Sequence, residues 1–259
     1  MIASAQNERV KLAHALLTQA KTRRRERKIA LEGVRLIDDA IERGRTPDFI
    51  LYDAAAIDYT RLAAWQARVR PERLLSITPD LSKHLSTTEQ PQGAVAVFPL
   101  PVPDLPRQPR RVLILDAIRD PGNLGTILRT AAAAGVQVVI LSPDCVDPYN
   151  PKVLRAGMGA HFRVPIVEAP WHESAPYCDG LAIYRAASSG DADYTGVDWA
   201  AWALIIGSEA HGASDQAQAI ATQRIRIPMA AATESINAAA AAAVLLFEAA
   251  RQRTQHRSG

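Results

Sequence analysis

The sequence has little of several features that mark particular classes of protein. Its two cysteines, Cys145 and Cys178, are too few for a disulfide framework or a four-ligand zinc site. No apolar run approaches the roughly 18 residues of a membrane span, and charged residues interrupt the first apolar stretch too early for a signal peptide. We therefore expect a reduced, cytoplasmic protein with no metal site and no membrane partner.

Common cofactor and nucleophile motifs are also missing. Gly122 and Gly125 are spaced as G-x-x-G without the full G-x-G-x-x-G pattern, so NAD binding has little support. The chain has no Gly-Lys-Ser/Thr phosphate loop and no G-x-S-x-G elbow. These gaps weigh against one alternative, an enzyme that uses a nucleotide cofactor on small molecules.

What is present is an ordinary globular composition with an uneven charge. Hydrophobic residues make up 48% and charged residues 22% of the chain. Residues 1–110 carry 18 Lys/Arg against 13 Asp/Glu, whereas residues 111–259 carry 12 against 14. Six of the eight residues in 21–28 are basic. A basic front half predicts capture of a polyanion there, with the chemistry in the back half.

A proline-rich segment separates the two halves. Five of the eleven residues in 99–109 are proline, which excludes a helix or a central strand and favours a stiff linker. We therefore predict a front domain over residues 1–98, a linker over 99–110 and a back domain over 111–259.

Both halves have the patterns of α/β domains. In the front half, residues 7–20 and 34–43 have helical periodicity, and 29–31, 49–52, 73–77 and 94–98 resemble strands. In the back half, buried strands are expected at 111–115, 137–141, 164–167, 181–184, 202–206 and 224–227, with helices at 124–134 and 237–252. Alternation of strand and helix predicts a parallel sheet in the back domain.

Three loops that follow strands of the back domain hold the candidate functional residues, because ligands bind beyond the carboxyl ends of parallel strands. The first loop, residues 116–125, is rich in turn residues, and Asn123 is a candidate helix cap. Arg129 follows in the second turn of the predicted helix, among apolar neighbours. A partly buried arginine there suits an anion such as phosphate. The second, residues 207–212, has two glycines that permit close approach to a ligand, and Glu209. The third, residues 227–237, offers Ser235 or Asn237 as a helix cap.

Together these loops resemble the three motifs of the SpoU/TrmH family of RNA ribose 2'-O-methyltransferases, in the SPOUT class. The matching segments are DAIRDPGNLGTILRTA at 116–131, LIIGSEAHG at 204–212 and IPMAAATESINA at 227–238. Residues 157–165, GMGAHFRVP, also resemble a family segment. The front half, with its basic run, Glu32-Gly33 and Gln92-Gly93, is similar to the family's ribosomal-protein-like α/β substrate-binding domain.

The resemblance implies a fold and a set of sites. The back domain would be a parallel-sheet SPOUT domain with a C-terminal trefoil knot, and it would form a homodimer with an active site at the subunit boundary. S-adenosylmethionine would contact Gly207, Ile227, Met229, Ser235 and Ile236. Arg129 would be the central catalytic residue, assisted by Asn123, Glu209, Ser235 and Asn237. Because a guanidinium is a poor base, Arg129 is better interpreted as a phosphate clamp that stabilises the developing alkoxide.

The expected reaction is methylation of a ribose 2'-hydroxyl in RNA. Ribosomal RNA is favoured over transfer RNA, since the accessory domain accompanies the ribosomal enzymes of the family. In the front half, the candidates for sequence-independent RNA binding are Arg23, Arg24, Arg25, Arg27 and Lys28. A non-catalytic RNA-binding or assembly protein that keeps the fold remains an alternative.

Overall fold

The computed structural model describes residues 1–208, 212–230 and 235–257. It divides into two compact units, one of Met1–Pro101 with Tyr149–Phe162 and one of Val102–Pro148 with Arg163–Gly259. The segment Tyr149–Phe162 groups with the first unit, although the expected back domain included it. None of the described helices is both long and apolar enough to cross a bilayer.

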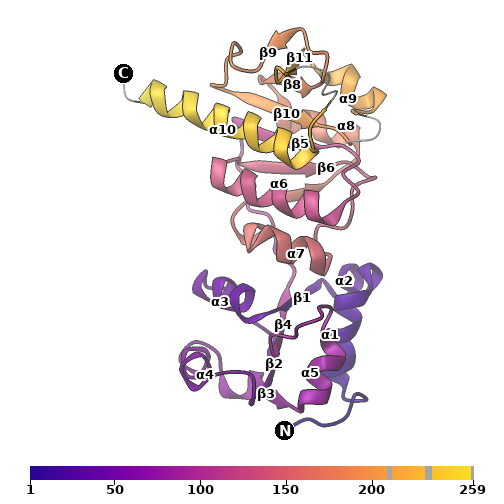
Figure 1. The fold of residues 1–259 in the computed structure, drawn as a ribbon, viewed down its shortest axis with the longest axis vertical. Coiled ribbons are helices and arrows are strands. Elements are labelled where there is room, and N and C mark those ends of the chain that lie inside the picture. Colours follow the sequence, from indigo (N-terminus) through magenta and orange to yellow (C-terminus); the bar gives the residue numbers. More distant parts are fainter. Residues whose placement is uncertain (209–211, 231–234, 258–259) are drawn as a thin grey trace. The chain divides into compact units, whose positions relative to one another are not determined.

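The first unit is an α/β sandwich (Figure 1). Its elements, in chain order, are α1 (Glu8–Thr18), α2 (Ala20–Glu26), β1 (Lys28–Glu32), α3 (Val34–Glu42), β2 (Phe49–Asp53), α4 (Tyr59–Gln66), β3 (Leu74–Ile77), α5 (Pro79–Leu85), β4 (Ala94–Pro99) and α7 (Pro151–Gly157). The described strands form one sheet in the order β1-β4-β2-β3, in which only β2 and β3 run parallel.

Alternation along the strands gives this sheet two buried faces, because successive side chains point to opposite sides. On one face Ala30 and Leu51 pack with Leu16 of α1 and Leu85 of α5. On the other face the next residues along, such as Ile29 and Ile50, pack with α3, α4 and α7 through Ile37, Trp65 and Leu154. The strand predictions for the front half are confirmed to within two residues at each end.

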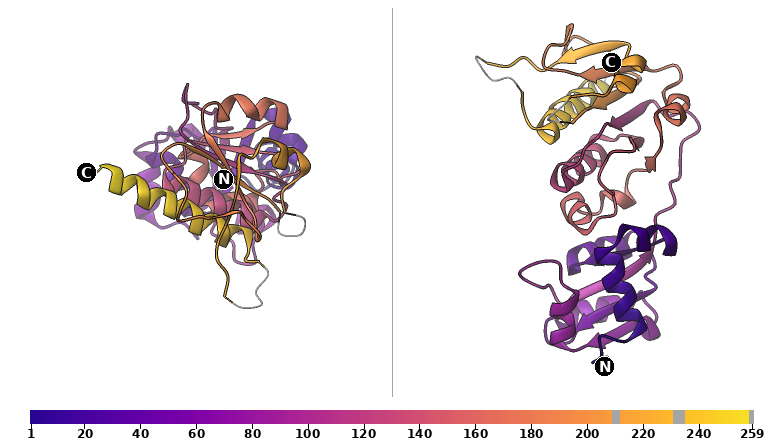
Figure 2. Two further views of the ribbon diagram at one scale, coloured as in Figure 1. Left: turned by 90° about the horizontal axis from the view of Figure 1, so that it is seen from above. Right: turned by 90° about the vertical axis from the view of Figure 1, so that its right-hand side faces the viewer.

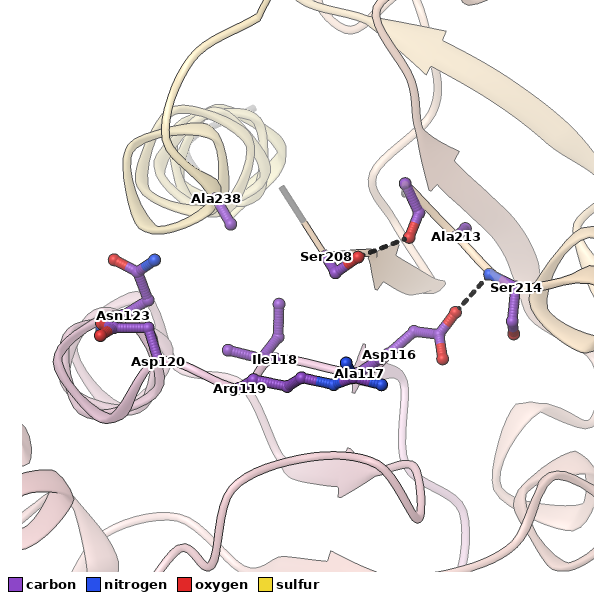
Figure 3. Close-up of a pocket in the computed structure, with 11 residues that line it drawn as sticks. Asp116, Ala117, Ile118, Arg119, Asp120, Asn123, Ser208, Ala213, Ser214 and Ala238 are labelled. Carbon is purple, nitrogen blue, oxygen red and sulfur yellow. Dashed lines mark hydrogen bonds between the residues drawn. The ribbon is translucent and has the colours of Figure 1, made fainter. Parts of the chain in front are cut away.

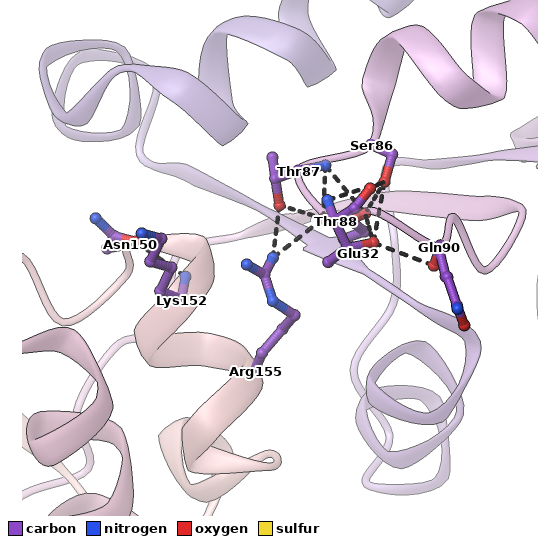
Figure 4. A network of polar contacts seen from close by, with 8 residues as sticks. All are labelled: Glu32, Ser86, Thr87, Thr88, Gln90, Asn150, Lys152 and Arg155. Carbon is purple, nitrogen blue, oxygen red and sulfur yellow. Dashed lines mark hydrogen bonds and ion pairs between the residues drawn. The ribbon is translucent and has the colours of Figure 1, made fainter.

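A buried carboxylate joins three parts of this unit (Figure 4). Glu32, at the end of β1, accepts hydrogen bonds from Ser86 Oγ at 2.6 Å, Thr88 Oγ1 at 3.2 Å and the backbone and hydroxyl of Thr87. Arg155 Nη1 of α7 lies 3.1 Å from Glu32 Oε2 and also donates to Thr87 Oγ1 at 2.6 Å. The Glu32 network therefore fastens α7 and the loop after α5 to the sheet.

The second unit is built on a parallel sheet. Its described elements are β5 (Arg111–Leu115), α6 (Pro121–Ala134), β6 (Val138–Leu141), β7 (Ile166–Glu168), α8 (Trp171–Ser174), β8 (Ala182–Ala186), β9 (Ala192–Asp193), β10 (Trp202–Ile206), α9 (Asp215–Ile220), β11 (Gln223–Arg226) and α10 (Ala238–Arg257). In the described residues the strand order is β7-β6-β5-β10-β8-β11-β9, and every pairing is parallel. The predicted parallel α/β sheet is thus confirmed.

Helices cover both faces of this sheet (Figures 1 and 2). One face packs Ile114, Ile140 and Ile205 against α9 through Ala217. On the other, α6 and the long α10 lie side by side, and Arg253 of α10 donates to the carbonyl of Ala134 at the end of α6. All the strands end at the same edge, so the loops after β5, β8, β10 and β11 gather there.

Local chemistry explains where α6 begins and corrects one expectation. The helix starts at Pro121, three residues earlier than predicted, because Asp120 is its N-cap and accepts from Asn123 N at 2.7 Å. Asn123 is therefore not the cap, and its side chain is available for another contact. Gly135 ends the helix with a φ of 78°, as a C-terminal glycine should.

Several helices of the structure were not predicted from the sequence. The basic run is a helix, α2, separated from α1 by an extended Gln19. The helices α4, α5, α7 and α9 have six to eight residues each, too few turns for a clear helical period.

Candidate functional site

Two adjoining cavities lie at the carboxyl edge of the parallel sheet. The larger, about 340 Å³, is here called the Ile227 cavity, and the other, about 320 Å³, the Asn123 cavity. Ser208, Gly212 and Ala238 line both. Volumes near 300 Å³ suit a small ligand, so this edge can hold two ligand groups next to each other.

The five residues expected to contact the cofactor come together in one place. Gly207, Ile227, Met229, Ser235 and Ile236 all line the Ile227 cavity. They come from the end of β10 and from the segments that follow β11, which are 20 or more residues apart in the chain. Their predicted role as cofactor contacts stays a prediction, but their placement in one cavity agrees with it.

The lining of the Ile227 cavity indicates what kind of ligand it suits. Apolar side chains dominate, among them Ile206, Ile225 and Leu245, and the polar side chains are three serines, Ser188, Ser208 and Ser235. None of the described lining residues carries a charge. Such a wall fits an adenine ring and a thioether chain and offers no cation to the phosphates of a dinucleotide.

The Asn123 cavity lies between the first loop on one side and Ser208, Ser214 and Ala238 on the other (Figure 3). Asp116 follows β5, is 2% exposed and accepts from Ser214 N at 2.6 Å, which ties the first loop to the segment before α9. Ala117 has a φ of 55°, an unusual value for a residue with a Cβ, and its N–H donates to Ser142 Oγ at 3.0 Å. These contacts hold the exposed Arg119 and the half-buried Asn123 on the cavity wall.

Two of the predicted catalytic residues contact each other. Asn237 Nδ2 donates to Asn123 Oδ1 at 3.0 Å, and this bond joins the third loop to the first. Asn237 Oδ1 also accepts from the N–H groups of Ala239 and Ala240, so Asn237 caps α10. Of the two predicted caps, Asn237 is correct. Ser235 lies instead on the Ile227 cavity.

Arg129 differs from its expected environment. The sequence placed it among apolar neighbours and predicted partial burial, but the side chain is exposed. Successive residues of a helix turn by 100°, so Arg129 points to another side of α6 than Leu128 and Ile127, which take the buried positions. It is not among the described residues that line either cavity. Glu209 lies outside the described residues.

The first glycine of the second loop also makes a close contact within the chain. A Cβ on Gly207 would lie 2.5 Å from Ala213 N and would overlap the backbone of Gly212. Gly207 therefore permits a close approach within the chain, where Ser208 and Gly212 exchange backbone hydrogen bonds of 3.0 and 2.9 Å. The expected approach to a ligand stays a prediction. Gly212 has a φ of 67°, in the left-handed region that favours glycine.

The predicted RNA-binding residues of the first unit do not form one set. Arg24, Arg25 and Arg27 are exposed, and Lys28 is half-buried with its ammonium 2.8 Å from Asp48. Arg23, however, is 4% exposed and donates to the carbonyl of Leu16 at 2.6 Å. The expectation that Arg23 contacts RNA is wrong, because its guanidinium fastens α2 to α1.

Sequence reasoning missed one part of the cavity wall altogether. Ala186, Ala187 and Ser188, at the end of β8, line the Ile227 cavity. The signal available was their position directly after a predicted strand, the same rule that selected the other three loops. These residues have small side chains and belong to none of the three motifs, so the sequence did not single them out.

Fold and site together define a class: a parallel α/β domain with an uncharged ligand cavity at the carboxyl edge of its sheet, joined to a second α/β unit. Residues 110–247 match the SpoU rRNA methylase family, and residues 7–96 match the MRM3-like substrate binding domain. The chain therefore belongs to the SpoU rRNA methylase family, as the three motifs indicated.

Known relatives extend this match to nearly the whole chain. The mitochondrial rRNA methyltransferase 3 of Mus musculus is 34% identical over 89% of this chain and 69% of its own length. The 23S rRNA (guanosine(2553)-2'-O)-methyltransferase RlmP of Bacillus subtilis is 32% identical over 95% and 97%. The crystal structure of the SpoU methyltransferase AviRb from Streptomyces viridochromogenes, in complex with the cofactor AdoMet, superimposes with a TM-score of 0.84 at 30% identity, covering 96% and 99%.

Proposed function

We propose that this protein methylates a ribose 2'-hydroxyl of ribosomal RNA, with S-adenosylmethionine bound in the Ile227 cavity. The observation that carries the proposal is the gathering of all five expected cofactor residues on that cavity, directly beside a second cavity at the same sheet edge. The similarity to an AdoMet-bound SpoU methyltransferase supports the cofactor. The names of the relatives favour ribosomal RNA.

The two cavities suit the geometry of methyl transfer. S-adenosylmethionine supplies an electrophilic methyl group on a sulfonium sulfur. The Asn123 cavity receives the acceptor nucleotide, and the three residues shared by both cavities stand where the two ligands meet. The chain's main task is to hold the ribose oxygen in line with the methyl carbon, because alignment supplies much of the rate of such a transfer.

Each predicted catalytic residue has a role in this scheme. Arg129 binds a phosphate of the RNA and stabilises the negative charge that develops on the 2'-oxygen, since a guanidinium stays protonated. Asn123 and Asn237, bonded to each other, position the ribose. Ser235 presents its hydroxyl to the cofactor, and Glu209 orients Arg129 or the ribose.

We also propose that the protein acts as a homodimer through the second unit, with a trefoil knot formed by its C-terminal segment. Val244 and Phe247 of α10 are apolar yet 37% and 52% exposed, as expected of residues that a second copy covers. An active site at the subunit boundary would also bring the exposed Arg129 close to the RNA phosphate that it is proposed to bind. Analytical ultracentrifugation of Phe247→Asp, expected to be monomeric and inactive, tests this arrangement.

The first unit would deliver the RNA, in keeping with its match to a substrate binding domain. We keep the proposed division into an RNA-binding domain at 1–98, a linker at 99–110 and a methyltransferase domain at 111–259. Arg24, Arg25, Arg27 and Lys28 are the proposed phosphate contacts. The cytoplasmic location stays a prediction, and relatives include mitochondrial enzymes.

The deciding experiment is a transfer assay. Purified protein is incubated with radiolabelled S-adenosylmethionine and ribosomal RNA that lacks its own modifications, and any labelled ribose is mapped. We expect label on a 2'-oxygen and a fall in rate of about 10²–10³-fold in Arg129→Ala, with cofactor binding unchanged. If only transfer RNA, tested in the same way, is labelled, the substrate is transfer RNA and not ribosomal RNA. Absence of both label and cofactor binding would favour a non-catalytic RNA-binding protein.

A further inference from the structure

The segment 142–146, which follows β6, is bonded to the start of the first loop. Backbone hydrogen bonds run from Ser142 N to Leu115 O at 3.0 Å and from Val146 N to Ile118 O at 2.9 Å. Because β5 and β6 are neighbouring parallel strands, the segment and the first loop leave the sheet at the same edge. The segment is therefore in a position to support the loop.

Two side chains of this segment bind backbone groups of the first loop. Ser142 Oγ accepts a hydrogen bond from Ala117 N at 3.0 Å. Cys145 Sγ accepts from Ile118 N at 3.4 Å and donates to the carbonyl oxygen of Leu115 at 3.2 Å. Two consecutive N–H groups of the loop are thus each held by a different side chain.

The backbone that these bonds hold is strained at Ala117. Its φ of 55° lies in the left-handed region, which a residue with a Cβ rarely adopts. Among the described residues, the other two non-glycine residues with a positive φ are Arg27 and Met158, and each of them ends a helix, where that conformation is common. Ala117 follows a strand and ends no helix, so its conformation depends on the contacts around it.

The strained backbone forms part of the wall of the Asn123 cavity. Ala117 and Ile118 line that cavity beside Arg119 (Figure 3). Ser142 is 6% exposed and Cys145 is half-buried, and neither is among the described residues that line either cavity. The two side chains therefore support the cavity wall from behind.

The bond from Cys145 to the carbonyl of Leu115 needs a protonated thiol. Burial raises the pKa of the Cys145 thiol above its ordinary value of 9.0, so the thiol keeps its proton at neutral pH. A serine hydroxyl can also donate one hydrogen bond and accept another, whereas an alanine side chain can do neither. Serine and alanine at this position therefore separate the bonds from the sulfur atom.

We propose that Ser142 and Cys145 are positioning residues for methyl transfer. They hold residues 116–118 in the strained conformation that shapes the Asn123 cavity, and through this wall they align the acceptor nucleotide. The inference rests on the proposed function, in which the Asn123 cavity receives that nucleotide. It adds two residues that lie outside the three family motifs and act through the backbone of the first loop.

The test measures steady-state kinetics of the full-length protein on ribosomal RNA, together with binding of S-adenosylhomocysteine by calorimetry. We expect Ser142→Ala and Cys145→Ala to lower kcat/KM for RNA by about tenfold or more, because a small displacement of the reacting groups slows transfer strongly. The KM for S-adenosylmethionine and the Kd for S-adenosylhomocysteine should stay unchanged, since none of the described residues that line the Ile227 cavity belongs to the first loop.

Two rescue variants distinguish positioning from a general loss of stability. Cys145→Ser keeps a donor and an acceptor in place of the thiol and should recover most of kcat/KM. Ala117→Gly removes the strain, because glycine adopts a positive φ freely. Ser142→Ala should therefore cost less when it is combined with Ala117→Gly than when it is made alone.

Matched controls come from the same unit. Thr222 Oγ1 accepts from Ile183 N at 2.9 Å and donates to Ile183 O at 3.0 Å, the same two kinds of bond that Cys145 makes. Cys178 is a buried thiol of the hydrophobic core. Neither residue is among the described residues that line the two cavities. Thr222→Ala and Cys178→Ala should keep the kcat/KM of the wild type, even where they lower the melting temperature.

The outcomes separate this inference from the proposed function. An unchanged kcat/KM for RNA in Ser142→Ala and Cys145→Ala would overturn the inference and leave the proposed function standing. An equal loss in the two control variants would also overturn it, because the loss would then follow stability. If the wild type transfers no methyl group to RNA, the proposed function fails and this inference fails with it.

Discussion

At the scale of single residues, Asn237 carries two functions in one side chain. Its Oδ1 caps α10 and its Nδ2 reaches Asn123. Serine caps a helix about as well as asparagine but offers no amide at that reach. We expect Asn237→Ser to keep the melting temperature and to lower the rate of methyl transfer by roughly tenfold or more, since Asn123 loses its partner. A single-turnover assay beside thermal unfolding measures both quantities.

The comparison with Asn237→Ala completes that test. Alanine removes cap and contact together and should also cost about 1 kcal/mol of stability. Wild-type transfer by the serine variant would mean that the contact between the two asparagines does not serve the reaction.

Cys178 links a single residue to the pH dependence of stability. Burial raises the pKa of its thiol from 9.0 to about 11. In the unfolded chain the thiol loses its proton as the pH passes 9, whereas the folded protein keeps it until about pH 11. The contribution of this thiol to stability is therefore complete below pH 9 and is lost between pH 9 and 11. Urea unfolding at pH 8, 9 and 10 should show a steeper decline in wild type than in Cys178→Ala.

At the scale of elements, the Glu32 network decides how securely α7 is attached. Removal of Glu32 leaves Arg155, whose side chain is 28% exposed, without its carboxylate, and takes from Thr87 the acceptor of its N–H and hydroxyl. We expect Glu32→Ala to lower the free energy of unfolding of the first unit by about 3 kcal/mol. Glu32→Gln, which keeps an acceptor, should cost less.

Urea unfolding followed by the fluorescence of Trp65, which is buried in the first unit, measures this loss. The tryptophans of the second unit are replaced beforehand, so that Trp65 alone gives the signal. Arg43→Ala is the control, because Arg43 pairs with Asp39 on the exposed surface of α3. It should cost well under 1 kcal/mol. If Glu32→Ala and Arg43→Ala lose the same free energy of unfolding, Glu32 contributes no more to stability than an exposed charge does.

Elements with a strong period could be read from the sequence, and short ones could not. The continuous apolar runs of β5, β6 and β10 stand at or within one residue of their predicted positions because strands buried on both faces need such runs. The start of α6 was placed late because the turn Asp-Pro-Gly-Asn is also a good capping sequence, and only the hydrogen bond from Asn123 N to Asp120 decides between the two.

At the scale of the whole molecule, the uneven charge predicts a salt-dependent interaction with RNA. Arg25 and Arg27 are exposed on the first unit, and each phosphate contact should contribute about 0.7–0.9 to the slope of log affinity against log salt. We expect the double change Arg25→Glu and Arg27→Glu to weaken RNA binding and to leave cofactor affinity unchanged. The slope of log affinity against log salt should fall by the contribution of one to two phosphate contacts.

Filter binding across a range of salt concentrations measures the slope. The matched control is Arg68→Glu with Arg70→Glu, which reverses two exposed arginines of the same unit outside the predicted patch. If both pairs weaken binding equally, the net charge of the unit, and not the position of α2, sets the affinity.

The sequence by itself determined the class of fold, the order of the three motifs and the five candidate residues that share the Ile227 cavity. Strand runs, turn residues and motif spacings are local properties, and parallel strands bring every following loop to one edge. Only the tertiary structure decided that Arg23 is buried, that Arg129 is exposed, that Asn123 meets Asn237 and that Ser188 faces the cavity. Each of these depends on contacts between segments far apart in the chain or on the turn of a helix relative to its neighbours, and no local pattern encodes such contacts.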